Sequence, residues 1–417
     1  MSESLPRRAR PTPRLKRALG LMQAVLYGLG VTIGAGIYVL IGAMAREAGL
    51  LTPIAFLLAA ALISLTAASF AEMGSRVPVS ASEAAYVEAA FKSRYLSLLA
   101  GILVVAAAVV SAAAIAAGSV GYIQVFVDLS PPVILTGVLL VMGAIAAWGI
   151  VESVTLAGLM TMIEVGGLLL IIGAGLWSSP DVTGKLPEVA LALQRPDSWV
   201  GISGAALLAV FAFIGFEGLA NINEELVEPA RTLPLAILLT LAVTAVIYVL
   251  VAVVALAAIG PEALASTGAP LALVFQRLTR LPPLVMSGIA VIAVLNGIIV
   301  QIIVASRVLY GLSSRGLLPS VIGRVHARTQ TPLAATALTV AVSLLLALTL
   351  PLEPLADATS RVVLVLFALV NLSLIRIKRR EALPPRGIFL CWRWVPYAGL
   401  ASCLLLLGLD AARSLLA

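Results

Sequence analysis

Residues 32–37 read Thr-Ile-Gly-Ala-Gly-Ile and lie in the middle of the first long apolar segment of the chain. A helix in a lipid bilayer finds no water for loose backbone groups, so two glycines at its centre need an explanation. One explanation is a break in the helix that forms half of a ligand site. The other is close helix packing, because Gly30 and Gly34 also form a small-xxx-small pair. A second interrupted helix elsewhere would favour the break.

The composition places the chain in a membrane. Of its 417 residues 61% are hydrophobic and 11% are charged, and the mean hydropathy is +1.11, far outside the range of a soluble domain. The net charge of +7 does not indicate a nucleic acid partner, because basic residues of a membrane chain belong first to its cytoplasmic loops. The expected partners are the lipid bilayer and a small molecule.

Metal and disulfide chemistry find little support in the sequence. His326 is the only histidine, which excludes a His-rich metal site. Cys391 and Cys403 fall within one predicted helix and are too far apart along it to bridge each other. We therefore expect no cofactor, apart from H⁺ or Na⁺ as a coupling ion.

Eleven apolar runs are long enough to cross a bilayer as helices, which predicts an all-α polytopic protein. The runs fall at 19–45, 50–74, 95–127, 132–151, 154–177, 199–222, 234–260, 283–311, 333–350, 355–375 and 388–416. If the N-terminus is cytoplasmic, 20 of the 27 lysines and arginines lie at cytoplasmic helix ends, so this orientation is expected. Between the second and third runs, residues 83–91 show helical spacing of apolar positions and predict an interfacial helix on the cytoplasmic side.

The chain divides into two halves of five helices each. Residues 1–18 are expected to form a cytoplasmic tail, 19–180 the first repeat, 199–376 the second repeat, and 388–417 an additional eleventh helix. An odd number of helices in each half gives the two halves opposite topologies. The sequence therefore predicts a five-plus-five inverted repeat.

The sixth run also contains glycines at its middle. Residues 211–218 read Phe-Ala-Phe-Ile-Gly-Phe-Glu-Gly, with Gly215 and Gly218 on either side of Glu217. At a rise of about 1.5 Å per residue, Ile33 lies about 21 Å and Ile214 about 22 Å from the start of its run. Both breaks therefore fall near the bilayer midplane.

Paired breaks at this depth suit a zwitterion. The second half of the first helix begins with free N–H groups and a positive dipole end, which suit a carboxylate. The first half of the sixth helix ends with free C=O groups, which suit an ammonium. Together they predict a receptor for the backbone of an α-amino acid.

Several motifs together resemble the amino acid/polyamine/organocation transporters, and most closely their bacterial cationic amino acid transporter-like branch. These are the two break sequences, Glu224-Glu225, residues 228–234 (Glu-Pro-Ala-Arg-Thr-Leu-Pro), residues 307–310 (Arg-Val-Leu-Tyr), residues 316–319 (Gly-Leu-Leu-Pro) and Thr331-Pro332. The resemblance covers about residues 20–376. It implies a leucine transporter-like fold, amino acid binding at the breaks and alternating access. The family usually has twelve helices, whereas eleven are predicted here.

The candidate substrate-binding residues come from the two breaks. They are Thr32, Ile33, Gly34, Ala35, Gly36 and Ile37 in the first helix, and Phe211, Ala212, Phe213, Ile214, Gly215 and Phe216 in the sixth. The phenylalanines close over the ligand or pack against lipid and core; we favour Phe211 and Phe216 as site residues. Glu217 either faces the substrate or a gate, or caps broken backbone. Glu225 and Arg231 fit inner-gate salt bridges or a structural role.

Glu164 stands where sodium-independent relatives often carry a lysine in the fifth helix. It lies about 17 Å deep, where a carboxylate is costly unless it is protonated, paired or ion-bound. We favour a proton carrier; a sodium ligand and a neutral, hydrogen-bonded structural carboxyl remain alternatives. Asn296 in the eighth helix matches the region that faces this site in the family. It positions the carboxyl, ligates an ion, or forms a simple interhelical hydrogen bond.

The predicted function is secondary active transport of amino acids, with proton-linked symport favoured. The alternatives are an amino acid exchanger and a sensor that keeps the fold without turnover. An intramembrane enzyme would need a carboxyl pair such as Glu164 and Glu217, but no catalytic motif accompanies these residues, so we expect no enzyme. The expected location is the cytoplasmic membrane of a prokaryote.

Overall fold

The first crossing of the bundle consists of two short helices rather than one. In the computed structural model, which describes residues 19–78, 82–148, 154–178, 186–381, 383, 385 and 387–416, α1 (Leu21–Ile33) ends and α2 (Gly36–Ala48) begins two residues later. The sixth crossing is interrupted in the same way, between α9 (Pro196–Phe213) and the 3₁₀ helix η3 (Phe216–Glu225). The predicted tail, residues 1–18, lies outside the described residues.

The remaining elements are helical. In chain order they are η1 (Gly49–Leu51), α3 (Thr52–Arg76), α4 (Ser82–Phe91), α5 (Arg94–Gln124), α6 (Pro131–Trp148), α7 (Val154–Ser178), α8 (Leu186–Leu193), α10 (Pro229–Ser266), α11 (Pro270–Thr279), α12 (Leu284–Ser314), α13 (Leu333–Thr349), α14 (Leu352–Arg380) and α15 (Val395–Leu416). The described residues add one isolated parallel bridge, between Leu19 and Leu226. The all-α prediction is thus confirmed.

The eleven predicted crossings correspond to these helices. Nine segments of the described chain are long and apolar enough to span a bilayer, one of them running from Gly36 to Arg76 through both α2 and α3. The shorter apolar helices α1 and α13 complete the set. The predicted interfacial segment 83–91 is helical, as α4. The sequence did not predict the short connecting helices α8 and α11.

The last predicted helix was placed too early in the chain. It was expected from residue 388, but α15 begins at Val395 with Pro396 in its first turn, where the missing N–H of proline costs no hydrogen bond. The preceding residues are held instead by polar groups of α3 and α14. The prediction that Cys391 and Cys403 share one helix was therefore wrong; both thiols are free.

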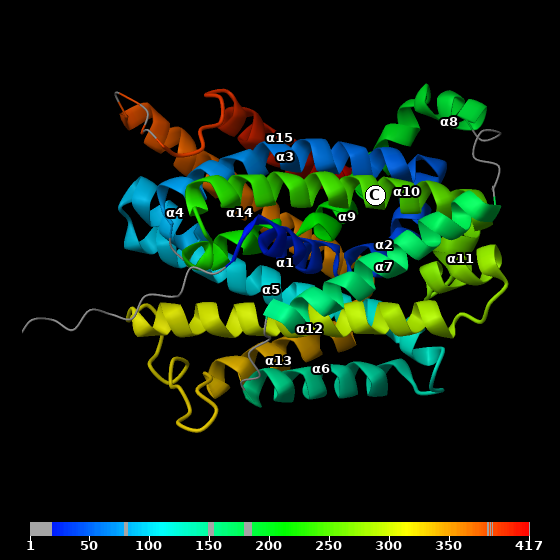
Figure 1. The fold of residues 1–417 in the computed structure, drawn as a ribbon, viewed down its shortest axis with the longest axis horizontal. Coiled ribbons are helices and arrows are strands. Elements are labelled where there is room, and N and C mark those ends of the chain that lie inside the picture. The colour runs from blue at the N-terminus through cyan, green and yellow to red at the C-terminus, as the bar shows by residue number, and fades with distance from the viewer. Residues whose placement is uncertain are drawn as a thin grey trace, which may run out of the picture.

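The two broken crossings lie in the middle of the bundle. Figure 1 shows α1 between α10 on one side and α5 on the other, with α6 and α13 at the outer edge. Aromatic side chains fill the core beside the breaks: Phe213 packs against Phe56 and Tyr248, and Phe216 packs against Phe70 and Phe367. From Gly28 to Ala45 every residue except Val31 is buried, so the broken part of the first crossing is held by protein rather than by lipid.

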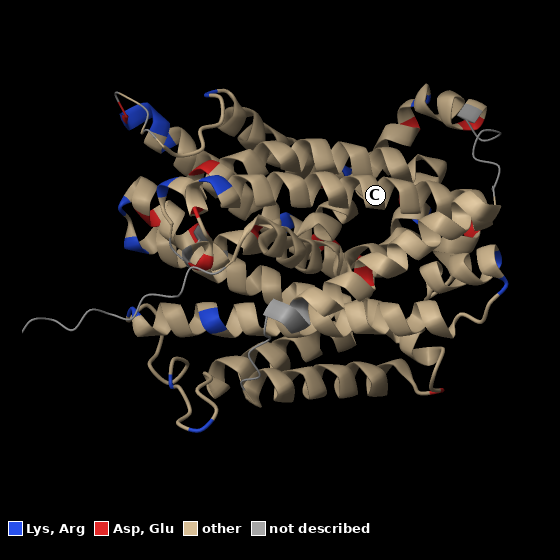
Figure 2. Cartoon of the chain, viewed as in Figure 1, with Lys and Arg blue, Asp and Glu red and all other residues tan. Residues whose placement is uncertain are grey.

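Charged residues gather at the two ends of the bundle, as a membrane-spanning chain requires. Lysines and arginines are concentrated at the end that contains α4 and the last turns of α14, here called the α4 end (Figure 2). The opposite end carries α8 and α11 and is called the α11 end (Figure 1).

Candidate substrate site

The two breaks are in direct contact, and one glycine in each makes the contact possible. A Cβ on Gly36 would lie 2.7 Å from the Cα of Ala212, and a Cβ on Gly215 would lie 2.5 Å from the carbonyl oxygen of Val31. Gly215 also has a φ of 131°, which side-chain-bearing residues rarely adopt. Each break thus leaves room for the backbone of the other.

A helix break and close helix packing both occur at the first-helix glycines, but at different residues. A Cβ on Gly30 would lie 2.0 Å from Oγ1 of Thr161 on α7, so Gly30 is a helix-packing glycine. A Cβ on Gly34 would have only carbonyl oxygens of its own helix near it, at 3.5 and 3.6 Å. Gly34 instead lies where α1 ends.

Tyr248 of α10 joins the carbonyl ends of the two broken helices. Its hydroxyl lies 3.1 and 3.2 Å from the carbonyl oxygens of Thr32 and Ile33, and 2.9 Å from that of Ala212. A hydroxyl carries one proton and donates to one acceptor at a time, so carbonyl lone pairs at both breaks remain available to a further donor. A ligand ammonium would be such a donor.

The start of α2 supplies hydrogen-bond donors, whereas the ends of α1 and α9 supply acceptors. The first hydrogen bond of this helix runs from the Val39 N–H to the Ala35 carbonyl, over 3.1 Å. The N–H groups of the preceding residues, from Gly36 on, therefore have no acceptor earlier in their own helix. Together with the positive end of the helix dipole, these groups suit a carboxylate.

A small cavity of about 30 Å³ lies between the breaks. Its lining comes from α1, α2, α5, α9 and α12, and includes no charged side chain among the described residues. Thr32 contributes a side-chain oxygen that is buried and makes no hydrogen bond to the described residues. The cavity therefore offers backbone polarity and hydroxyl or amide groups, but no fixed charge.

The structure brings half of the predicted substrate-binding residues to this cavity. The residues that line it are Thr32, Gly34, Ala35, Gly36, Phe211 and Ile214. The residues outside its lining are Ile33, Ile37, Ala212, Phe213, Gly215 and Phe216. Ala212 and Gly215 lie at the crossing of the two breaks, while Phe213 and Phe216 belong to the aromatic core.

Six further lining residues were not singled out from the sequence. They are Val31 on α1, Ser111 and Ile115 on α5, and Gly297, Val300 and Gln301 on α12. Within α5 and α12, lining residues recur four positions apart, the spacing of one helix face. Asn296 also lines the cavity, so this spacing would have predicted that Val300, four residues later on the same helix face, lines it too.

Glu164 and Asn296, predicted as a coupling pair, are in contact. The Nδ2 of Asn296 donates to Oε1 of Glu164 over 2.9 Å, and Glu164 is fully buried. The Tyr38 hydroxyl of α2 donates to the backbone oxygen of Glu164 over 2.6 Å. Since Asn296 also lines the cavity, one side chain joins the Glu164 carboxyl to the cavity.

The three predicted gating residues have separate positions. Oε2 of Glu217 accepts the Gly215 N–H over 2.9 Å, so this carboxylate caps the broken backbone. The backbone oxygen of Glu225 accepts the Leu19 N–H over 3.0 Å beside the parallel bridge. Arg231 lies in a groove at the start of α10. The ion pairs of the described residues do not join these side chains to one another.

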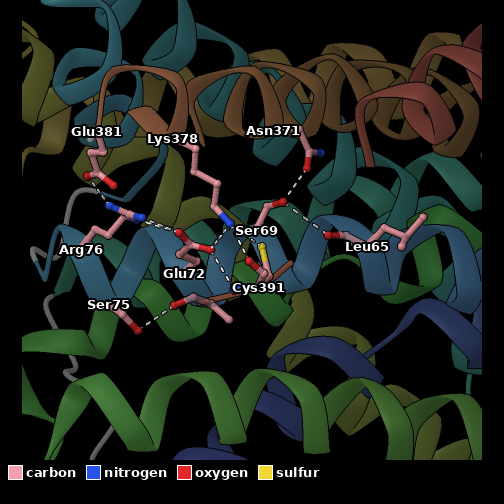
Figure 3. Close-up of polar contacts among 10 residues, drawn as sticks. Leu65, Ser69, Glu72, Ser75, Arg76, Asn371, Lys378, Glu381 and Cys391 are labelled. Carbon is pink, nitrogen blue, oxygen red and sulfur yellow. Dashed lines mark hydrogen bonds and ion pairs between the residues drawn. The ribbon is translucent and has the colours of Figure 1, made fainter. Parts of the chain in front are cut away.

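A network of buried charges ties three segments together at the α4 end (Figure 3). Glu72 of α3 is fully buried and pairs with Arg76 and with Lys378 of α14, each at 2.7 Å. It also accepts the backbone N–H of Cys391 over 2.8 Å. Burial, and then the Glu72 carboxylate, raise the pKa of the Cys391 thiol to about 12, so the thiol stays protonated at neutral pH.

Ion pairs also join helices at the α11 end. Arg46 of α2 pairs with Glu353 of α14 and donates to the Ala265 carbonyl of α10 over 2.7 Å. The neighbouring Glu47 pairs with Arg413 of α15 at 2.5 Å. The second half of the first crossing is therefore tied to three helices beyond the cavity.

Two broken crossings whose polar ends meet at a cavity within the bundle define a membrane transporter with the leucine transporter-like fold. A solved structure of MhsT in complex with L-phenylalanine has this fold, and matches with a TM-score of 0.63 and 15% sequence identity over 96% of this chain and all of that chain. The amino acid permease family model matches residues 19–411, and the chain belongs to this family.

Known relatives of the chain are transporters. The branched-chain amino acid permease BcaP of Bacillus subtilis is 29% identical over 89% of this chain and 83% of its own length. Human cationic amino acid transporter 4 is 27% identical over 89% of this chain and 61% of its own length. The protein is thus an amino acid permease family transporter and not an enzyme.

Proposed function

We propose that this transporter carries neutral α-amino acids together with a proton across the cytoplasmic membrane of a prokaryote, with the α4 end in the cytoplasm. The observation that carries the substrate class is the uncharged lining of the cavity between N–H groups of α2 and carbonyl groups of α1 and α9. A cationic or anionic substrate side chain would have no counter-charge there, and an unpaired buried charge is costly. The basic α4 end supports the orientation.

A panel of amino acids tests the substrate class. Neutral amino acids are expected to raise the melting temperature of the detergent-purified protein, because a ligand that binds only the folded state stabilises it. Arginine, lysine, aspartate and glutamate are expected to give no shift. Radiolabelled hits should then enter proteoliposomes; uptake only against internal amino acid would indicate an exchanger, and binding without uptake or exchange would indicate a sensor. Stabilisation by cationic amino acids alone would refute the proposed class.

Glu164 is proposed as the proton carrier. A carboxyl group buried in an apolar environment favours its protonated form and releases the proton when its surroundings change. We expect Glu164→Gln to abolish the stimulation of uptake by an inward proton gradient while retaining substrate binding and exchange, measured in proteoliposomes with and without the gradient.

Two controls make this result specific. Replacing sodium by potassium on both sides should leave wild-type uptake unchanged if the proton is the coupling ion. Glu188→Gln changes an acidic residue of α8, outside the cavity lining, and should preserve the response to the gradient. If Glu164→Gln keeps the full gradient response, the carboxyl is structural and another group carries the proton.

A further inference from the structure

The Asn296 side chain faces both the cavity and Glu164. It lines the cavity, is 7% exposed, and uses Nδ2 to donate to the Glu164 carboxylate. Its Oδ1 is buried and accepts no hydrogen bond from the described residues. A buried amide oxygen that makes no hydrogen bond costs free energy, so a partner on the cavity side would be stabilising.

Asn296 precedes the residue of α12 that packs against the first break. The next residue, Gly297, packs against the first break, since a Cβ on it would lie 3.5 Å from the Cβ of Ala35. Ala35 directly precedes the N–H groups of α2 that suit a carboxylate. The group of an amino acid closest to Asn296 is therefore its carboxylate rather than its ammonium.

We propose that the protonation state of Glu164 determines which group of the Asn296 amide, its oxygen or its N–H donor, faces the bound amino acid. The inference rests on the proposed function and deepens it, because it says how proton and substrate binding are linked. When Glu164 is ionised, Nδ2 donates to it, as observed, and Oδ1 faces the substrate carboxylate unfavourably. When Glu164 is protonated, its O–H donates to Oδ1, and the amide turns to donate from Nδ2 to the substrate carboxylate.

The turn needs only rotation of the terminal amide. This torsion is broad and about two-fold, and an amide carries its donor and acceptor on opposite arms. No covalent bond changes except that of the transferred proton. By linkage, a proton that strengthens amino acid binding is itself bound more strongly when the amino acid is present. Because each strengthens the binding of the other, the proton and the amino acid bind to the transporter together, as symport requires.

Other titratable groups near Glu164 do not compete with it in this role. Tyr38 of α2 and Tyr248 of α10 face it from the helices around it. Phenols ionise near pH 10, so both stay neutral over the physiological range. A change in affinity between acidic and mildly alkaline pH is therefore assigned to a carboxyl. Glu217, which caps the break at Gly215, is the other carboxyl at the site, and loss of the change in Glu164→Gln assigns it to Glu164 rather than to Glu217.

Calorimetric binding of L-alanine to the purified protein tests the inference; if another panel member stabilises more strongly, it replaces L-alanine. For wild type, the Kd is expected to fall about tenfold from about pH 8.5 to about pH 5.5, within the range typical of coupled sites. In Asn296→Leu the Kd should vary by less than about twofold over this range. Asn296→Ala, which introduces no bulk, should behave in the same way.

Asn371→Leu is the matched control. Asn371 is also a buried asparagine within a helix, α14, but it bonds to Ser69 and Thr66 and does not line the cavity. This variant should keep the wild-type pH dependence even if it is less stable. Size-exclusion profiles establish which variants are folded.

The outcomes separate the inference from the function on which it rests. If both Asn296 variants keep the tenfold change while Glu164→Gln binds equally at every pH, the amide does not carry the coupling. If Glu164→Gln keeps the change, the proposed proton site itself is refuted. A wild-type Kd that does not depend on pH overturns the inference, whereas the proton-gradient experiment decides the coupling independently.

Discussion

Gly36→Ala is expected to abolish amino acid binding, so that no member of the panel raises the melting temperature of the purified variant. The added Cβ would lie 2.7 Å from the Ala212 Cα, and 3.3 Å from the Ala212 carbonyl oxygen. Ordinary contacts lie at about 3.5–4.0 Å, so the two breaks would separate by about 1 Å. A displacement of this size can cost about 100-fold where groups must be aligned.

Gly137→Ala provides the control for this substitution. Gly137 lies in α6, and a Cβ on it would meet nothing within 4 Å, so binding should match wild type. Calorimetry with the strongest ligand of the panel measures both variants. Wild-type affinity in Gly36→Ala would show that the crossing of the breaks does not shape the site.

Glu72→Leu is expected to lower the free energy of unfolding by about 3 kcal/mol, measured by reversible denaturation in mixed micelles. The substitution removes the carboxylate shared by Arg76 and Lys378, whose side chains are 7% and 12% exposed. The large effect comes from charges left in a protein interior without their counter-ion.

Two further variants test that explanation. Glu381 pairs with the same Arg76 but is 32% exposed, so Glu381→Gln should cost less than about 1 kcal/mol. The double variant Glu72→Leu with Lys378→Met removes both members of a buried pair and should recover part of the loss. If the double variant is less stable than Glu72→Leu alone, the unpaired lysine is not the source of the effect.

The fold could be predicted from the sequence because its main determinants are local. Each crossing appears as an apolar run, and each break as glycines within such a run. Hydropathy does not determine the ends of a helix where polar contacts decide them. The segment before α15 is one example, since Glu72 and Lys378 hold Cys391 outside the helix.

The site could be predicted only in part because its geometry depends on neighbours distant in sequence. Tyr248 looks like any tyrosine in a span until its contact with Thr32, 216 residues away, is known. Gly30 and Gly34 cannot be told apart without Thr161 of α7. Glu164 and Asn296 were recognisable because a carboxyl and an amide at mid-depth are unusual in any helix.

The parallel bridge between Leu19 and Leu226 restricts how this protein can open toward the α4 end. The Leu19 N–H donates to the Glu225 carbonyl over 3.0 Å, and the Val227 N–H donates to the Leu19 carbonyl over 2.9 Å. These bonds fasten the start of α1 to the end of η3, while Tyr248 fastens the other ends of α1 and α9. An outward swing of α1 by itself would break both backbone bonds, so α1 and η3 are coupled as one moving part.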